Sequence, residues 1–302
     1  ADSPAEDVVA IATTTQLGDV ADQIARCAGS SVTTLMGVGD DPHEFSVSSA
    51  QIAEMTRVPL VITNGLGLEG GMSSAIENAV SDGANVLEIA PLVDPLPFTS
   101  RAHDHEDGHD DEDGHDDGHD DGHGHDHTGD DPHFWHDPMR MAQAARIIGD
   151  EFTAVTGDDA FAACAVETAT ELESLDAEVR EILSEVPEEN RYIITDHAAF
   201  GYFGDVYGFT QAGVVIPGGS TEAEPSSEEL AELVDVIRET GVNAIFSNNA
   251  GASRLVDAVA AEAGEIEVVQ LFEGSLGPDG SGAETYQTMM ISNARLIADA
   301  LR

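Results

Sequence analysis

The sequence contains no lysine, so its eleven basic residues are all arginine and face 59 acidic residues. The formal net charge of −48 makes nucleic acid and anionic membranes poor partners. One function of such charge is cation steering; the alternative is a solvated acidic surface suited to very high salt. We favour the second, because the Debye length at molar salt is only about 3 Å and long-range steering is lost. The composition therefore predicts a protein from a halophile.

The sequence also lacks any run of eighteen apolar residues, which predicts that no helix spans a membrane. Its first residues carry no apolar leader, and we interpret the chain as a mature form whose export signal was removed. Cysteine is scarce: Cys27 and Cys164 lie in predicted helices without metal-type spacing. A single disulfide is one alternative, but we expect two buried free thiols and assign them no role.

Hydrophobic residues make up 41% of the 302 residues, which is enough for a globular core. Short apolar runs alternate with helical patterns in both halves of the chain, which predicts β/α units with mainly parallel four-stranded sheets. The predicted strands are 8–14, 31–37, 58–64, 85–91, 191–196, 212–217, 243–248 and 267–272. The fold class is therefore α/β, with two β/α lobes.

Between the lobes, Pro138 begins a segment in which Met141, Ala145, Ile148 and Phe152 recur at helical spacing. We expect one rigid linking helix of about twenty residues, roughly 30 Å long. The chain then divides into an N-terminal lobe at 1–136, a linking helix at 137–157 and a C-terminal lobe at 158–302. Such a linker favours a modest tilt of the lobes over wide closure.

Residues 103–127 consist only of Gly, His, Asp and Glu, and they contain eight of the twelve histidines. With no apolar side chain to bury, this segment is predicted to be a mobile loop. An expression tag and an inert acidic spacer are the alternatives, but the loop is internal and rich in His. Our hypothesis is weak binding of several Zn²⁺ ions, for capture and hand-over or for sensing zinc.

Three of the other histidines, His43, His133 and His197, each follow an Asp or Asp-Pro close to a predicted strand or lobe edge. Ligands of open α/β sheets collect beyond the carboxyl ends of strands, so these side chains can converge in one cleft between the lobes. A lone histidine is more often simply hydrogen-bonded, but three together favour a zinc site. The fourth, His136 in "HFWH", we interpret as a bystander or an outer partner of the ligands.

The main rival to a binding protein is a metal-dependent hydrolase. The sequence contains no H-E-x-x-H, no G-x-S-x-G and no glycine loop that would cradle phosphate. The glycine-rich stretch at 65–71 is predicted to be an ordinary loop. We therefore expect no enzyme, with a zinc-dependent hydrolase and a zinc buffer without a transporter as alternatives.

Several motifs together resemble a known family: "GDDPHEFSVSSAQI", "VITNGLGLEGGM", "DPHFWHDPMRM", "TDHAAFGYFGDVYGF" and the closing "LGPDGSGAETYQTMMISNARLIADAL". They are similar to the zinc-binding members of the metal-specific, ZnuA-like solute-binding proteins of ABC importers (cluster A-I). The resemblance implies an interlobe Zn²⁺ site and delivery to a membrane permease. It further implies a monomer located outside the cytoplasm at the cell surface, with a lipid anchor to the outer face of the membrane as one mode of attachment.

The resemblance places metal ligands at His43, His133 and His197. In manganese-binding relatives the position of His197 is usually a carboxylate, so a third imidazole favours zinc over the alternative, a manganese carrier. Relatives often carry Asp where this chain has Gly274, and Glu273 precedes it. The fourth ligand is then Glu273, water or a loop histidine. Asn248 occupies a position that is often Glu in manganese-type relatives, which weakens the case for a carboxylate-rich site.

Overall fold

The computed structural model describes residues 8–98, 129–250, 254–264 and 266–302. The predicted histidine-rich loop at 103–127 therefore lies outside the described residues. Within the described part of the chain, no helix is long and apolar enough to cross a bilayer.

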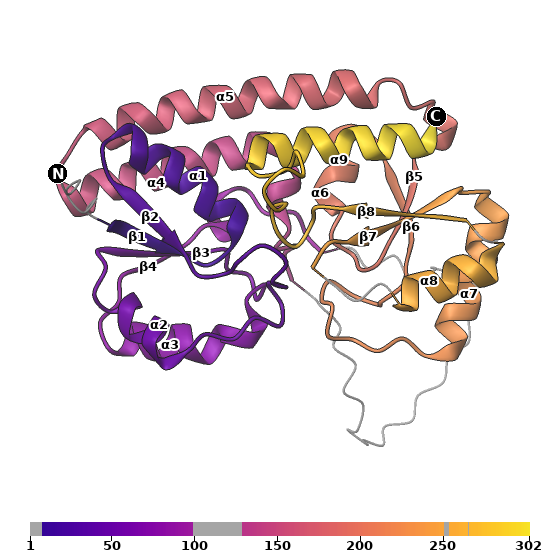
Figure 1. Cartoon of the computed structure of the whole chain (residues 1–302), viewed down its shortest axis with the longest axis horizontal. Helices are drawn as coiled ribbons and strands as arrows, with labels where there is room; N and C mark the ends of the chain where they lie inside the picture. Colours follow the sequence, from indigo (N-terminus) through magenta and orange to yellow (C-terminus); the bar gives the residue numbers. More distant parts are fainter. Residues whose placement is uncertain (1–7, 99–128, 251–253, 265) are drawn as a thin grey trace, which may run out of the picture.

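Two four-stranded sheets form the centres of two lobes (Figure 1). The strand order is β2-β1-β3-β4 in the first sheet and β6-β5-β7-β8 in the second, and all the strand pairs described are parallel. The predicted fold class is thereby confirmed, and each strand overlaps a predicted segment. The strands are β1 (Val8–Ala12), β2 (Ser31–Thr34), β3 (Leu60–Thr63), β4 (Val86–Glu88), β5 (Tyr192–Thr195), β6 (Thr210–Val214), β7 (Ala244–Asn248) and β8 (Glu267–Leu271).

Helices cover both faces of each sheet (Figure 1). The α-helices are α1 (Thr15–Cys27), α2 (Ser49–Met55), α3 (Ser73–Ser81), α4 (Pro138–Thr156), α5 (Ala160–Leu183), α6 (Gly201–Tyr207), α7 (Ser227–Thr240), α8 (Arg254–Ala263) and α9 (Tyr286–Leu301). The short 3₁₀ turns are η1 (Gly70–Met72), η2 (Ala90–Leu92), η3 (Phe134–His136) and η4 (Glu188–Asn190).

The central strands β1, β3, β5 and β7 are mostly apolar and are buried on both faces, as is usual for parallel sheets covered by helices. Side chains alternate across a strand, so Leu60 and Ile62 of β3 join one core cluster while Val61 joins another. In the second lobe, Ile193 and Ile194 of β5 divide in the same way. One cluster runs through both lobes beneath α1, α4, α5 and α9, so the two lobes share a core.

The segment predicted to be a linking helix forms α4. Asp137 caps it by accepting a hydrogen bond from the Met139 N–H at 2.8 Å, and Gly157 ends it in the left-handed conformation. The next helix, α5, is longer and packs against α1 of the first lobe, α9 of the second and α4 (Figure 1). Contact with helices of both lobes is therefore a property of α5, which the sequence analysis assigned to the C-terminal lobe at 158–302.

The cysteines correct one expectation. Cys27 and Cys164 form a disulfide with a Cα–Cα distance of 5.9 Å, so they are not the free thiols that we expected. The bond joins the last residue of α1 to the beginning of α5. The two cysteines are 137 residues apart, and nothing in such a spacing indicates that α1 and α5 pack against each other.

Loss of this disulfide is expected to lower the free energy of unfolding by about 2–4 kcal/mol, because the bond constrains a long loop of the unfolded chain. The change is the double substitution Cys27→Ser and Cys164→Ser, and urea denaturation followed by circular dichroism is the measurement. Wild-type protein under reducing conditions is the matched control and should give the same unfolding midpoint as the double variant. Equal midpoints for the oxidised and reduced wild type would contradict the prediction.

Candidate metal centre

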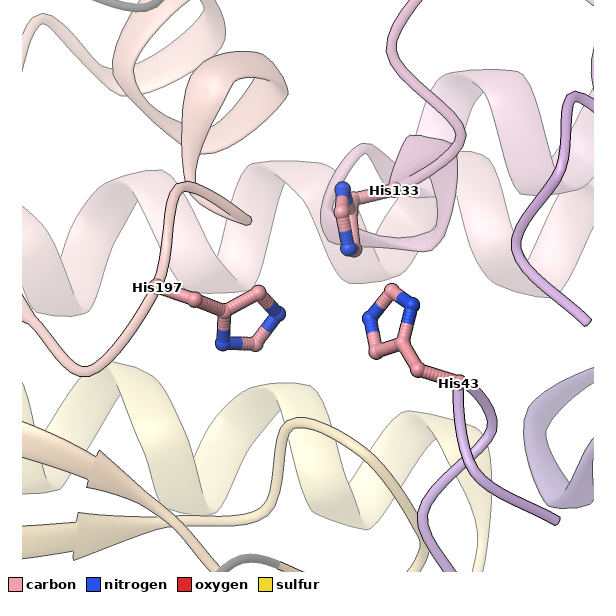
Figure 2. A group of neighbouring side chains, drawn as sticks. All are labelled: His43, His133 and His197. Atoms are coloured by element: carbon pink, nitrogen blue, oxygen red, sulfur yellow. The ribbon is translucent and has the colours of Figure 1, made fainter. Parts of the chain in front are cut away.

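Three imidazole rings from distant parts of the sequence meet between the lobes. One nitrogen each of His43, His133 and His197 lies within 4.8 Å of the other two. All three histidines are buried: His43 is 4% exposed, and His133 and His197 are 0% exposed. Figure 2 shows the rings pointing toward one another from three separate segments. Among the residues that the structure describes, no other set of three His, Cys, Asp or Glu side chains comes this close.

The repeated Asp-Pro-His motif builds the same turn twice. The carboxylate of Asp41 accepts a hydrogen bond from the backbone N–H of His43, and that of Asp131 accepts one from His133, each at 2.9 Å. An Asp side chain that binds the backbone two residues on is a common turn, and the intervening proline has no N–H to compete. The motif thus projects each histidine side chain from a fixed backbone.

Carboxylates also orient two of the rings. The Nδ1 atom of His133 lies 2.8 Å from Asp131 Oδ1, and that of His197 lies 3.0 Å from Asp196 Oδ1. Each Nδ1 then carries the proton, and each Nε2 is left as the lone-pair donor toward the centre (Figure 2). The Nε2 atom of His197 is fully buried and has no hydrogen-bond partner. Such an atom is costly unless it binds a ligand, which fits a metal ion.

Two residues outside the predicted set hold the turns of the first lobe. Asn64, directly after β3, donates to the Pro132 carbonyl at 2.9 Å, and the Gly71 N–H donates to the His43 carbonyl at 2.8 Å. A Cβ atom on Gly71 would lie 2.7 Å from the carbonyl oxygens of Glu44 and Phe45, so only glycine fits. The loop that we predicted to be ordinary therefore supports His43. The cluster of glycines in this loop was the sequence feature that could have indicated such a close contact.

In the second lobe, Asn248 is the last residue of β7, and it binds the loop that carries Glu273 and Gly274. Its backbone N–H donates to Asp196 Oδ2 at 3.0 Å, and its Oδ1 accepts from Gly274 N at 3.0 Å. A Cβ atom on Gly274 would lie 2.9 Å from that same Oδ1. An aspartate at position 274 would therefore displace Asn248, which leaves Glu273 as the acid of this loop.

Glu273 is buried beside the three imidazoles but is not one of the set within 4.8 Å. Its Oε1 lies 3.9 Å from His197 Nε2 and 3.8 Å from His136 Nε2, and neither carboxylate oxygen has a hydrogen-bond partner. The ring of His136 thus lies beside Glu273. The turn η3 is a 3₁₀ turn, in which residues i and i+3 eclipse, so His133 and His136 face the same side.

The charges of the site favour a bound proton when no metal is present. Burial disfavours the charged ring of His197, but the carboxylates of Glu273 and Asp196 outweigh burial and raise the pKa of His197 to about 9. Burial likewise disfavours charge on Glu273, but the imidazole of His197 holds the pKa of Glu273 below its usual range. For Asp131, burial raises the pKa to about 7.

Hydrogen bonds across the lobes enclose the site. Thr221 donates to Asp41 Oδ2 at 2.8 Å, so the residue that fixes His43 is itself bound to the second lobe. Gln16 donates to the carbonyl of Glu273 at 2.8 Å, and the Gly39 N–H donates to Ser275 Oγ at the same distance. The ligand-bearing loops of both lobes are therefore held by contacts with the opposite lobe.

Comparison with known proteins agrees with this arrangement. A family model described as "Zinc-uptake complex component A periplasmic" matches residues 10–300. The chain is 28% identical to the manganese-binding lipoprotein MntA of Halalkalibacterium halodurans, over 94% of this chain and 85% of that protein. It is 26% identical to the zinc-binding protein TroA of Treponema pallidum, over 95% of this chain and 87% of that protein.

A solved structure of the periplasmic zinc-binding protein TroA from Treponema pallidum superposes with a TM-score of 0.79 and 24% identity, covering 98% of this chain and 99% of that one. The fold is therefore that of TroA, and the family match extends through both lobes. The chain belongs to the ZnuA family and is a metal-binding solute-binding protein of an ABC importer.

Proposed function

We propose that this protein captures one Zn²⁺ ion outside the cytoplasm and delivers it to the permease of an ABC importer. The observation that carries the proposal is the convergence of His43, His133 and His197 in a buried position. Zinc bonds to imidazole nitrogen measure about 2.0–2.1 Å, so ligand atoms of a tetrahedral ion lie roughly 3.4 Å apart. Small tilts of the three rings would bring their nitrogens to that spacing.

The second candidate is a manganese carrier, because the similar MntA lipoproteins are named as manganese-binding. Imidazole suits Zn²⁺, whereas Mn²⁺ favours carboxylate, carbonyl and water oxygens. The proposed ligand set has three nitrogens and one carboxylate, Glu273, with water or a loop histidine as the other ways to fill the fourth position. This set supports zinc. An anomalous scan at the zinc edge of metal-soaked crystals separates the two candidates.

The remaining parts of the proposal concern where the protein acts. We place it at the cell surface, consistent with the lipoprotein and periplasmic relatives, as a monomer that exchanges zinc with its permease. The charge of −48 fits an acidic surface adapted to high salt. Catalysis would need an open position on the metal and a nearby base; a carrier whose fourth position Glu273 fills offers no such position. The protein is therefore proposed to be no enzyme.

Removal of any one of the three imidazoles is expected to weaken zinc binding severely. The changes are His43→Ala, His133→Ala and His197→Ala, and each should cost more than the about 10- to 100-fold that outer partners of metal ligands contribute. Competition against a chromophoric chelator measures the affinity of the tight site. His115→Ala, one of eight loop histidines, is the control and should leave the tight site unchanged. A similar loss in all four variants would refute the assignment.

Zinc affinity is expected to fall as the pH decreases, and this fall should begin at a pH well above the range in which histidine ordinarily titrates. The pKa of His197 is raised to about 9 in the metal-free protein, and a protonated imidazole cannot bind metal. The apparent affinity should fall about tenfold per pH unit from pH 9 to 7, and more steeply below 7, where Asp131 becomes protonated.

Calorimetry in two buffers of different ionisation enthalpy measures this linkage directly. About one proton should be released per zinc ion near neutral pH. The His197→Ala variant, although weaker, should release no such proton. An affinity that is flat between pH 7 and 9 would contradict the prediction.

Deletion of residues 103–127, which lie outside the described residues, is expected to separate two classes of site. The deletion should leave one tight site and remove the weaker ones, because ordering a flexible segment costs about 1–2 kcal/mol per residue fixed. A calorimetric zinc titration counts both classes. Replacement of only the eight histidines of this segment by Asn is the matched control and should have the same effect. Loss of the tight site would contradict this separation of one tight site from the weaker sites of the loop.

A further inference from the structure

His136 and Glu273 form a buried pair that none of the assigned roles explains. His136 is 1% exposed and Glu273 is 2% exposed, yet His136 Nε2 and both carboxylate oxygens lack a hydrogen-bond partner. The His136 Nε2 and Glu273 Oε1 atoms are 3.8 Å apart, which is too long for a hydrogen bond. Buried polar groups are rarely left unsatisfied, so this pair is expected to find partners in the metal-loaded state.

We propose that His136 is a positioning residue that restricts Glu273 to binding the ion through a single oxygen, and that it thereby favours Zn²⁺ over Mn²⁺. The proposal rests on the function proposed above. With metal bound, one oxygen of Glu273 coordinates the ion beside His197. The other oxygen accepts a hydrogen bond from His136 Nε2.

The surroundings of both residues leave only the carboxylate free to adjust. The ring of His136 stacks on Phe200, with centroids 4.5 Å apart and an interplanar angle of 28°. The backbone of Glu273 is fixed by Asn249, which accepts from its N–H at 3.1 Å, and by Gln16, which donates to its carbonyl. Glu273 Oε1 lies almost midway between the two imidazoles, at 3.8 and 3.9 Å. Rotation of the Glu273 side chain alone can therefore bring one oxygen toward the ion and the other toward His136.

Single-oxygen binding has a consequence for the choice of metal. A carboxylate whose second oxygen is held by a donor cannot chelate the ion through both oxygens. Three imidazoles and one oxygen complete a tetrahedral zinc site. A harder cation that prefers six ligands, mostly oxygen, would find only one carboxylate oxygen among the proposed ligands. Hydrogen bonds to ligating carboxylates typically contribute 10- to 100-fold to metal affinity.

The test compares His136→Phe, which keeps an aromatic ring against Phe200 but has no donor, with His136→Gln, which keeps a donor. The full-length protein is titrated with Zn²⁺ alone and with Mn²⁺ alone, in competition with a chelator. His136→Phe should lower zinc affinity by about 10- to 100-fold and manganese affinity much less. His136→Gln should restore much of the difference between the two metals.

The absorption spectrum of bound Co²⁺ supplies the second measurement, because tetrahedral Co²⁺ absorbs much more strongly than five- or six-coordinate Co²⁺. We expect the absorption to fall in His136→Phe and to recover in His136→Gln. Equal losses for both metals, or an unchanged Co²⁺ spectrum in His136→Phe, would mean that the role of His136 is only structural. Equal impairment of the Phe and Gln variants would indicate direct ligation instead. Both results overturn the proposal.

Failure of this inference can be told apart from failure of the proposed function. If wild-type protein binds no metal tightly, or if His197→Ala binds as well as wild type, the carrier function itself is wrong. If wild-type binding depends on His197 but the ratio of zinc to manganese affinity is the same in His136→Phe, only the role of His136 is wrong.

Discussion

The site depends on buried imidazole rings whose orientation is fixed by neighbouring carboxylates. Asp131 and Asp196 each accept hydrogen bonds from the backbone N–H and the ring of the next histidine along the chain, so each carboxylate holds its ring in place. The Nε2 atom of His197 is left without a hydrogen-bond partner. An unsatisfied buried acceptor costs about 1–3 kcal/mol. In the metal-free state a proton on His197, stabilised by Glu273, offsets part of this cost. Metal binding replaces that proton, so affinity and pH are linked by the same contacts.

The architecture keeps these groups together. In a sheet of order 2-1-3-4, the strand order reverses between strands 1 and 3, which are the two inner strands. Ligands of such sheets bind at this reversal, beyond the carboxyl ends of the strands. His197 follows the central strand β5, and Asn64 follows β3 next to the central strand β1. The helix α5 contacts both lobes, and the Cys27–Cys164 disulfide ties α1 to it. A continuous core limits the lobes to small movements, which suits a site that needs only slight contraction around the ion.

The sequence predicted the lobes and the three imidazoles because both depend on local patterns. Apolar runs mark strands that are buried on both faces, and Asp-Pro-His is a turn signal in its own right. What the sequence missed depends on contacts between distant segments. The disulfide required knowledge that α1 packs on α5. The sequence left open whether His136 is a bystander or an outer partner of the ligands, because its distance to Glu273 depends on a contact between η3 and the loop after β8.

The crowding around Gly274 has a similar origin. Asn248 is 26 residues from Gly274, and only the pairing of β7 with β8 brings its side chain against that glycine. The family resemblance gave only the expectation of an acid at position 274. It cannot show that an amide occupies the space that an aspartate side chain would need.

The two kinds of charge in this protein act over different ranges. The exterior, with most of the −48 charge, attracts every cation, and salt screens that attraction within about 3 Å at molar concentration. It therefore cannot distinguish Zn²⁺ from other cations. The buried groups are screened much less, and they present imidazole nitrogen in a fixed geometry. Discrimination between metals must then come from the ligand atoms and from the residues that limit their movement, which is the role proposed for His136.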